Sequence, residues 1–240
     1  MNFTSEKEFN EFKKILTFLA AGSQGECFLD DKKKIVYKLF FDCFDEDYSC
    51  YYDKDEILRF NHLKNKTFIW PTNLITCNSK IIGYTAPYIK AQNLYKINPL
   101  TINLDNLELA IKKAYVDLKL LEKNNIIIFD IMYNLLFSKT NLYAIDNTEY
   151  CKGEETIENY RAFGKSISYF LVDGYFNDFI KQDKILNEMF YALDINILEF
   201  LKEFRMKLSA NIGSEITKLQ EAKKLIKKTY PERYIREIKK

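Results

Sequence analysis

Short apolar runs separated by polar turns fill the first part of the chain, up to about residue 90. Runs of this length, rich in β-branched and aromatic residues, are typical of strands. They predict strands over 14–21, 26–30, 34–41, 73–78 and 80–89. Asp30, Asp31 and Lys32 provide the turn between the second and third strands, and the last two strands form a hairpin pair.

Apolar residues at helical spacing predict the remaining elements. A helix is expected over 53–65, whose apolar residues Ile57, Phe60 and Leu63 share one face, and residues 5–13 are compatible with a further short helix. After about Gln92 the pattern changes from sheet to helix. A strongly amphipathic helix, three strand-like pieces and a long helical region are predicted at 104–123, 126–129, 135–138, 142–145 and from about 155 onward.

These elements predict an α+β protein with two lobes. Residues 1–91 form a sheet-rich lobe with one helix, and residues 92–240 form a mainly helical lobe. With 240 residues, of which 47% are apolar, the chain is large enough to bury a substantial core.

Charge and cysteine usage narrow the classes of partner. The 36 basic and 34 acidic residues give a net charge of +2, which provides no general attraction to nucleic acid or an anionic membrane. The five cysteines are scattered without a CxxC pair, which fits a reducing compartment. The acidic N-terminal residues are unlike a signal peptide, and no apolar stretch approaches the length of a membrane span. We therefore expect a cytoplasmic protein without a nucleic-acid or membrane partner.

A glycine turn followed by a lysine within a strand carries the most chemical information. Gly22 and Gly25 lie between apolar runs, where glycine lets the backbone approach a polyphosphate and adopt dihedral angles that a Cβ would block. Lys38 alternates with Val36 and Phe40 in the following strand and adds one positive charge. Together these residues predict a nucleotide-phosphate site, and ATP is the first ligand to consider.

The order of these residues along the chain resembles that of the protein kinase-like fold. Residues 20–27 are similar to the kinase glycine-rich loop, with Ala20 in place of its first glycine. Residues 36–38 stand where kinases carry V-A-I-K, and Glu56 resembles the αC glutamate that pairs with this lysine. The resemblance covers roughly residues 14–150 and indicates a minimal, divergent member of bacterial type.

Two later segments, IIIFDIMYNLLF and LYAIDNTEY, continue the resemblance. In them Asp130 resembles the catalytic-loop aspartate, Asn134 the metal-binding asparagine and Asp146 the aspartate of D-F-G. The resemblance implies a two-lobed fold, with an antiparallel sheet in its first lobe, that transfers the γ-phosphate of ATP with Mg²⁺ to a hydroxyl of a protein or a small molecule.

The resemblance also implies a role for each candidate residue. Lys38 would hold the α- and β-phosphates, Glu56 would orient this lysine, and Asp130 would accept or orient the substrate hydroxyl. Asp146 and Asn134 would hold Mg²⁺ through oxygen ligands. The residues expected to contact the nucleotide are Gly22, Ser23, Gln24, Gly25, Cys27, Lys38, Pro87, Tyr88 and Ile89.

The sequence departs from the kinase pattern at several points. Asn134 follows Asp130 by four residues instead of five, and Ile128-Phe129 replaces the usual His-Arg. Asn147-Thr148 follows Asp146 in place of Phe-Gly, and the A-P-E signature is missing. These departures leave open a small-molecule kinase, an atypical protein kinase, and a pseudokinase or scaffold that binds nucleotide without turnover. A helical nucleic-acid or membrane module built on the basic residues around 223–228 is a remoter alternative.

Two other features have simpler interpretations. Residues 163–166 are similar to the end of a P-loop, but Asn159 stands where its first glycine is required, so we interpret the segment as helix surface. His62 is the single histidine, which leaves no material for a catalytic triad or a two-histidine metal site.

Overall fold

The computed structural model describes every residue except 46, 48–52, 130, 155 and 227–240. The chain divides into two compact units. Unit 1 consists of Met1–Lys64, Ile69–Lys90 and Asp146–Glu149, and unit 2 of Asn65–Phe68, Ala91–Ile145 and Tyr150–Lys240. The combination of helices with a mixed sheet confirms the predicted α+β class.

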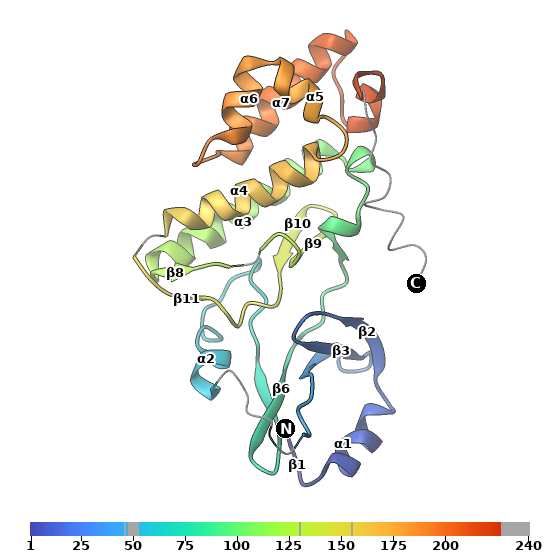
Figure 1. Cartoon of the computed structure of the whole chain (residues 1–240), viewed down its shortest axis with the longest axis vertical. Helices are drawn as coiled ribbons and strands as arrows, with labels where there is room; N and C mark the ends of the chain where they lie inside the picture. The colour runs from blue at the N-terminus through green and yellow to red at the C-terminus, as the bar shows by residue number, and fades with distance from the viewer. Residues whose placement is uncertain (46, 48–52, 130, 155, 227–240) are drawn as a thin grey trace. The chain divides into compact units, whose positions relative to one another are not determined.

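Unit 1 is built on a six-stranded sheet in the order β1-β5-β6-β4-β3-β2 (Figure 1). Neighbouring strands run antiparallel except for β1 and β5, which pair in parallel. The prediction of a purely antiparallel sheet is wrong for this pair. Strand β1 adds a parallel edge strand, and its two residues are too few to give a recognisable sequence pattern. The strands are β1 (Asn2–Phe3), β2 (Thr17–Ala21), β3 (Gly25–Asp30), β4 (Ile35–Phe40), β5 (Asn73–Cys77) and β6 (Lys80–Pro87).

The core of unit 1 lies between this sheet and helix α1 (Glu6–Lys13). Ile75 and Ile82 from the middle of the sheet are fully buried. Phe9 of α1 packs edge to face on Phe3 of β1, with ring centroids 5.3 Å apart. The core therefore joins α1 and the edge strand to the central strands.

Helix α2 (Lys54–Leu58) is shorter than the helix predicted over 53–65. Ile57 and Phe60 are buried, as the predicted apolar face requires. The chain nevertheless leaves the helix at Arg59 and continues in turns. The polar residues that follow, two asparagines and a histidine, are weak helix formers, and apolar spacing alone does not extend the helix through them.

Unit 2 contains the helical region predicted after residue 92 (Figure 1). Its helices are α3 (Leu104–Lys123), α4 (Ile157–Val172), α5 (Asn177–Gln182), α6 (Lys184–Tyr191) and α7 (Ile197–Ile212), with short 3-10 helices η1 (Leu94–Lys96), η2 (Pro99–Thr101) and η3 (Leu219–Leu225). Two small sheets have the strand orders β10-β9-β7 and β11-β8. Their strands are β7 (Gln92–Asn93), β8 (Ile126–Ile127), β9 (Leu135–Ser138), β10 (Asn141–Ala144) and β11 (Cys151–Lys152).

Helix α3 has the bounds that its amphipathic pattern predicts and lies beside α4 (Figure 1). Its apolar face is fully buried, with Leu107, Ile111 and Leu118 inaccessible to solvent. Phe200 of α7 packs on Phe190 of α6, with ring centroids 5.8 Å apart. Apolar and aromatic packing between helices thus forms the core of unit 2. Within the described part of the chain, no helix combines the length and apolarity needed to cross a bilayer.

Asn159 ties α4 to the segment that begins with β8. Its amide nitrogen donates to the carbonyl of Ile126 over 2.6 Å, and its amide oxygen accepts from the N–H of Ile128 over 2.9 Å. The P-loop-like residues 163–166 lie in the same helix, but Phe163 is fully buried and Ser166 nearly so. The interpretation as helix surface is therefore wrong, because α4 packs against both α3 and α7.

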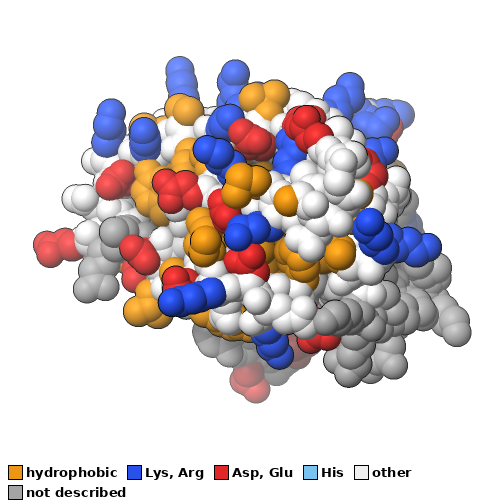
Figure 2. Space-filling model, turned by 90° about the horizontal axis from the view of Figure 1, so that it is seen from above, with side chains coloured by type: hydrophobic (Ala, Val, Ile, Leu, Met, Phe, Trp, Pro, Cys, Tyr) orange, Lys and Arg blue, Asp and Glu red, His pale blue; other side chains and the backbone are white. Residues whose placement is uncertain are grey.

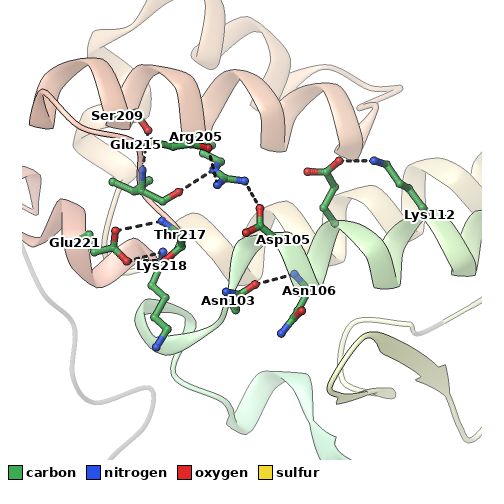
Figure 3. A network of polar contacts seen from close by, with 12 residues as sticks. Asn103, Asp105, Asn106, Lys112, Arg205, Ser209, Glu215, Thr217, Lys218 and Glu221 are labelled. Atoms are coloured by element: carbon green, nitrogen blue, oxygen red, sulfur yellow. Dashed lines mark hydrogen bonds and ion pairs between the residues drawn. The ribbon is translucent and has the colours of Figure 1, made fainter.

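Arg205 of α7 connects three parts of unit 2 (Figure 3). Its guanidinium donates to Asp105 of α3 over 2.5 Å, to Glu215 over 3.0 Å and to the carbonyl of Ile216 over 2.8 Å. Because only 17% of the Arg205 side chain is exposed, these contacts are partly shielded from water. They fix the chain after α7 against the start of α3.

Candidate functional site

Lys38 lies on the central strand β4 and is buried, with 6% of the residue exposed. Its cross-strand partners are Cys27 on β3 and Tyr84 on β6, so the three side chains share one face of the sheet. A buried ammonium needs an opposite charge or several acceptors, because removing an unpaired charge from water is costly. The environment of Lys38 must therefore supply such partners.

Asp146 supplies the opposite charge. Lys38 Nζ forms an ion pair with Asp146 Oδ1, and the hydroxyl of Tyr84 donates to the same oxygen over 3.2 Å. The ring centroid of Tyr84 lies 5.7 Å from Lys38 Nζ, which is within the range of a cation–π contact. All three residues belong to unit 1. The structure thus brings together the lysine assigned to the phosphates and the aspartate assigned to the metal.

Asp146 holds an uncommon backbone conformation with φ of +57°. Few residues other than glycine adopt this left-handed region, and aspartate and asparagine tolerate it best. Such conformations cost on the order of 1–3 kcal/mol and concentrate at functional sites. The next two residues carry buried oxygens, Asn147 Oδ1 and Thr148 Oγ1, that have no hydrogen-bond partner among the described residues.

The glycine turn differs from the sequence expectation in its backbone. Neither Gly22 nor Gly25 has a positive φ. The prediction that these glycines adopt dihedral angles that a Cβ would block is therefore wrong. Gly25 is required for another reason: a Cβ at this position would lie 1.9 Å from the carbonyl oxygen of Leu39 on the neighbouring strand. A Cβ at Gly22 would meet open space. The space around Gly22 therefore gives no packing reason for a glycine at this position.

Gln24 connects the glycine turn to Lys38 and to Glu149. Its side-chain oxygen accepts from Lys38 Nζ over 3.0 Å, and its side-chain nitrogen donates to Glu149 Oε1 over 2.9 Å. Ser23 beside it is exposed. The ammonium of Lys38 thus already binds an oxygen from the turn that was predicted to hold phosphate.

Glu56 has a local role in the structure. Its carboxylate accepts from the N–H of Asp53 over 2.9 Å, Asp53 accepts from the N–H of Glu56 over 2.7 Å, and the two form a capping box at the start of α2. A carboxylate oxygen of Glu56 also lies 3.7 Å from Arg59. The carboxylate that contacts Lys38 is that of Asp146, not that of Glu56.

The remaining candidates from the catalytic segment lie elsewhere. Asp130 lies outside the described residues. Asn134 belongs to unit 2, where its carbonyl oxygen accepts from the N–H of Ile145 over 3.0 Å. Its side-chain role as a metal ligand stays a prediction.

The other residues predicted to contact the nucleotide are Cys27 and three residues at the end of β6 and just after it, Pro87, Tyr88 and Ile89. Pro87 pairs with Ile35, and the N–H of Tyr88 donates to the carbonyl of Lys34 over 2.9 Å, so this segment continues along β4. Ile89 is partly buried. Burial raises the pKa of the Cys27 thiol above its ordinary value, which disfavours the thiolate.

Asp146 carries carboxylate oxygens of the kind that Mg²⁺ prefers. Mg²⁺ prefers oxygen ligands and keeps several waters, so it needs few protein ligands. Lys38 and Tyr84 occupy Oδ1 of Asp146, and no described residue donates to Oδ2. The described residues contain no cluster of three or more His, Cys, Asp or Glu side chains.

Sequence reasoning missed two members of this site, Tyr84 and Glu149. Tyr84 reaches Lys38 through the register between β4 and β6, and Glu149 reaches Gln24 because residues 146–149 pack with unit 1. Neither relation follows from local pattern. The one available signal was the alternation in β6, which places Tyr84 and Ile82 on the same face.

A groove of about 520 Å³ between α3 and α7 is a second candidate. Its charged lining includes Arg205 and Glu108, which are already paired with Asp105 and with Lys112 (Figure 3). On the face drawn in Figure 2, basic, acidic and apolar side chains are interspersed, without a large area of one charge. Neither surface points to a specific ligand as clearly as the Lys38 site does.

No protein-family model and no curated protein sequence matches this chain.

Proposed function

We propose that this chain is an ATP- and Mg²⁺-dependent phosphotransferase of the protein kinase-like fold, acting on a hydroxyl of a protein or a small molecule. The observation that carries the proposal is the ion pair between Lys38 and Asp146, the residues to which the resemblance assigns the phosphates and the metal. The contact of Lys38 with Gln24 adds support, since it joins the pair to the glycine turn.

Lys38 provides the charge for phosphate binding in this proposal. Its ammonium is buried on the sheet, where the attraction to a phosphate is stronger than in water. When ATP binds, its phosphate oxygens replace the amide oxygen of Gln24 as the acceptor. Gly22, where a side chain is missing and space is open, admits the phosphates beside the turn.

Asp146 and Asn134 are the residues that would hold Mg²⁺, and the bound ion would neutralise charge on the phosphates. Asp130 accepts the proton of the attacking hydroxyl. The hydroxyl oxygen forms a bond to the γ-phosphorus while the bond to the β–γ bridging oxygen breaks, and ADP leaves with that electron pair.

A second candidate function is nucleotide binding without turnover. It is supported by the capping role of Glu56, which leaves Lys38 without the glutamate that kinases use to orient it. The replacement of His-Arg by Ile128-Phe129 favours the same alternative. Both candidates share the phosphate site and differ in whether Asp130 performs chemistry.

Release of γ-phosphate from ATP in the presence of Mg²⁺ separates the two candidates. The phosphotransferase should turn ATP over slowly, and Asp130→Ala should lower the rate by about 10²–10³, the usual cost of removing one preorganised group. Asp194→Ala, at an exposed carboxylate in unit 2, serves as the control and should leave the rate unchanged. ATP binding without turnover would reject the phosphotransferase in favour of the binding protein, and a folded protein that binds no ATP would reject both.

A further inference from the structure

Tyr84 contacts both members of the Lys38–Asp146 pair. Its hydroxyl donates to Asp146 Oδ1 over 3.2 Å, and its ring lies 5.7 Å from Lys38 Nζ. It stands directly opposite Lys38 on the neighbouring strand β6 and is buried, with 4% of the residue exposed. The sheet register therefore sets its position.

We propose that Tyr84 is a positioning residue that fixes the Asp146 carboxylate for the metal-bound nucleotide, an inference that rests on the proposed function. The terminal torsion of aspartate is broad and roughly two-fold, so a carboxylate with a single partner can rotate. Here the ammonium of Lys38 and the hydroxyl of Tyr84 both reach Oδ1. Two donors on one oxygen restrict this rotation and fix the direction in which Oδ2 faces.

A tyrosine on a central strand suits this role. Its ring has few rotatable bonds and contacts two residues of β4, the aromatic ring of Phe40 at 6.2 Å and the ammonium of Lys38. The hydroxyl therefore keeps its place when the ammonium exchanges Gln24 for phosphate. A residue of the sheet thus orients the Asp146 carboxylate, whereas the residue that the resemblance assigned to orient Lys38, Glu56, belongs to a helix.

Mg²⁺ titration at a fixed ATP concentration tests this role, because it reads out binding and does not require turnover. Tyr84→Phe keeps the ring and removes only the hydroxyl. We expect the Mg²⁺ concentration at half-saturation to rise about tenfold, as for the loss of one hydrogen bond to a charged group. ATP affinity measured in EDTA should stay within about twofold, because Lys38 keeps its other contacts.

Tyr37→Phe is the matched control. Tyr37 is buried on the same sheet, but it neighbours Lys38 in β4 and so faces the other side, where its ring lies 5.2 Å from that of Phe12. It should leave the Mg²⁺ requirement unchanged. In an Asp146→Asn background, Tyr84→Phe should have no further effect on the Mg²⁺ requirement, because the hydroxyl acts through that carboxylate.

Three results would overturn the role of Tyr84 while leaving the proposed function intact. These are an unchanged Mg²⁺ requirement in Tyr84→Phe, an equal loss of ATP affinity with Mg²⁺ and in EDTA, and an equal effect of Tyr37→Phe. A wild-type protein that binds no ATP in either condition would contradict the proposed function itself, and the role of Tyr84 would fail with it.

Discussion

Lys38 Nζ contacts Oδ1 of Asp146, a residue 108 positions further along the chain, within the same compact unit. The short segment 146–149 returns from the second half of the sequence to pack with the sheet of unit 1. A lysine from a central strand and an aspartate in a left-handed conformation are thereby held together. This pair is the chemical centre of the proposed site.

The two glycines of the turn should respond differently to alanine. Gly25→Ala should destabilise the fold by several kcal/mol, on the order of 3, because the added Cβ would collide with the carbonyl of Leu39. Gly22→Ala should change the free energy of unfolding little, since its Cβ enters open space. Urea unfolding of both variants measures the difference, and equal costs would show that the packing at Gly25 is not tight. ATP titration of Gly22→Ala then reports whether phosphate approaches that position.

Gln24→Ala should strengthen ATP binding. In the ligand-free protein the Gln24 amide oxygen occupies Lys38 at 3.0 Å, and phosphate must displace it. Removing one competing hydrogen bond to a charged group, worth about 1.5 kcal/mol, should raise the affinity for ATP about tenfold. Adenosine, which has no phosphate, should bind with unchanged affinity. Weaker ATP binding in Gln24→Ala, measured by calorimetry, would instead make Gln24 a direct nucleotide contact.

Local pattern predicted those elements whose apolar faces are long. Helix α3 follows from the periodicity of its buried face, and the hairpin of β5 and β6 follows from two short apolar runs beside a turn. The turn-rich end of α2 and the two-residue strand β1 did not follow, since too few residues carry the pattern. Tertiary contacts decide such elements.

The sequence indicated two charged residues of the candidate site but not the residues that contact them. Lys38 and Asp146 were identified from residue type and order along the chain. The partners Tyr84 and Glu149 depend on strand register and on the return of residues 146–149, which no local spacing encodes. Glu56 was assigned by its place in the sequence, whereas the local hydrogen bonds of a capping box determine its position.

Arg205→Ala should destabilise unit 2 by about 2 kcal/mol. The Arg205 side chain is largely buried, and the change removes its charge-assisted hydrogen bonds to Asp105 and Glu215. It also removes the hydrogen bond to the carbonyl of Ile216. Arg161→Ala is the control, since its pair with Glu158 is a surface contact. That change should cost less than about 0.5 kcal/mol. Thermal unfolding of both variants checks this, and equal costs would mean that the Arg205 contacts contribute no more than a surface pair.

Because of Asp183, the free energy of unfolding should depend on pH in the acidic range. It accepts from the N–H of Leu186 at the start of α6 and pairs with Lys207 at 3.0 Å, and these contacts lower the pKa of its carboxyl below the ordinary 3.8. The folded state therefore binds a proton less readily than the unfolded state. This contribution is present above about pH 4 and is lost as the pH falls through the lowered pKa.

Asp183→Ala should thus cost about 1 kcal/mol at pH 7 and progressively less below pH 4, as measured by urea unfolding across the pH range. Asp183→Asn keeps an oxygen that caps the helix and removes the charge, so its smaller cost isolates the pair with Lys207. A cost of Asp183→Ala that stays constant down to pH 2 would contradict the assignment.

Calorimetric titration with ATP, with and without Mg²⁺, tests the site at Lys38 and Asp146 most directly. We expect Lys38→Ala to weaken binding at least about tenfold in both conditions, and Asp146→Ala to abolish the gain that Mg²⁺ provides. Lys32→Ala, at an exposed lysine in the turn before β4, should bind as the wild type does. ATP binding that is insensitive to both Lys38→Ala and Asp146→Ala, or a wild-type protein that binds no ATP, would contradict the account.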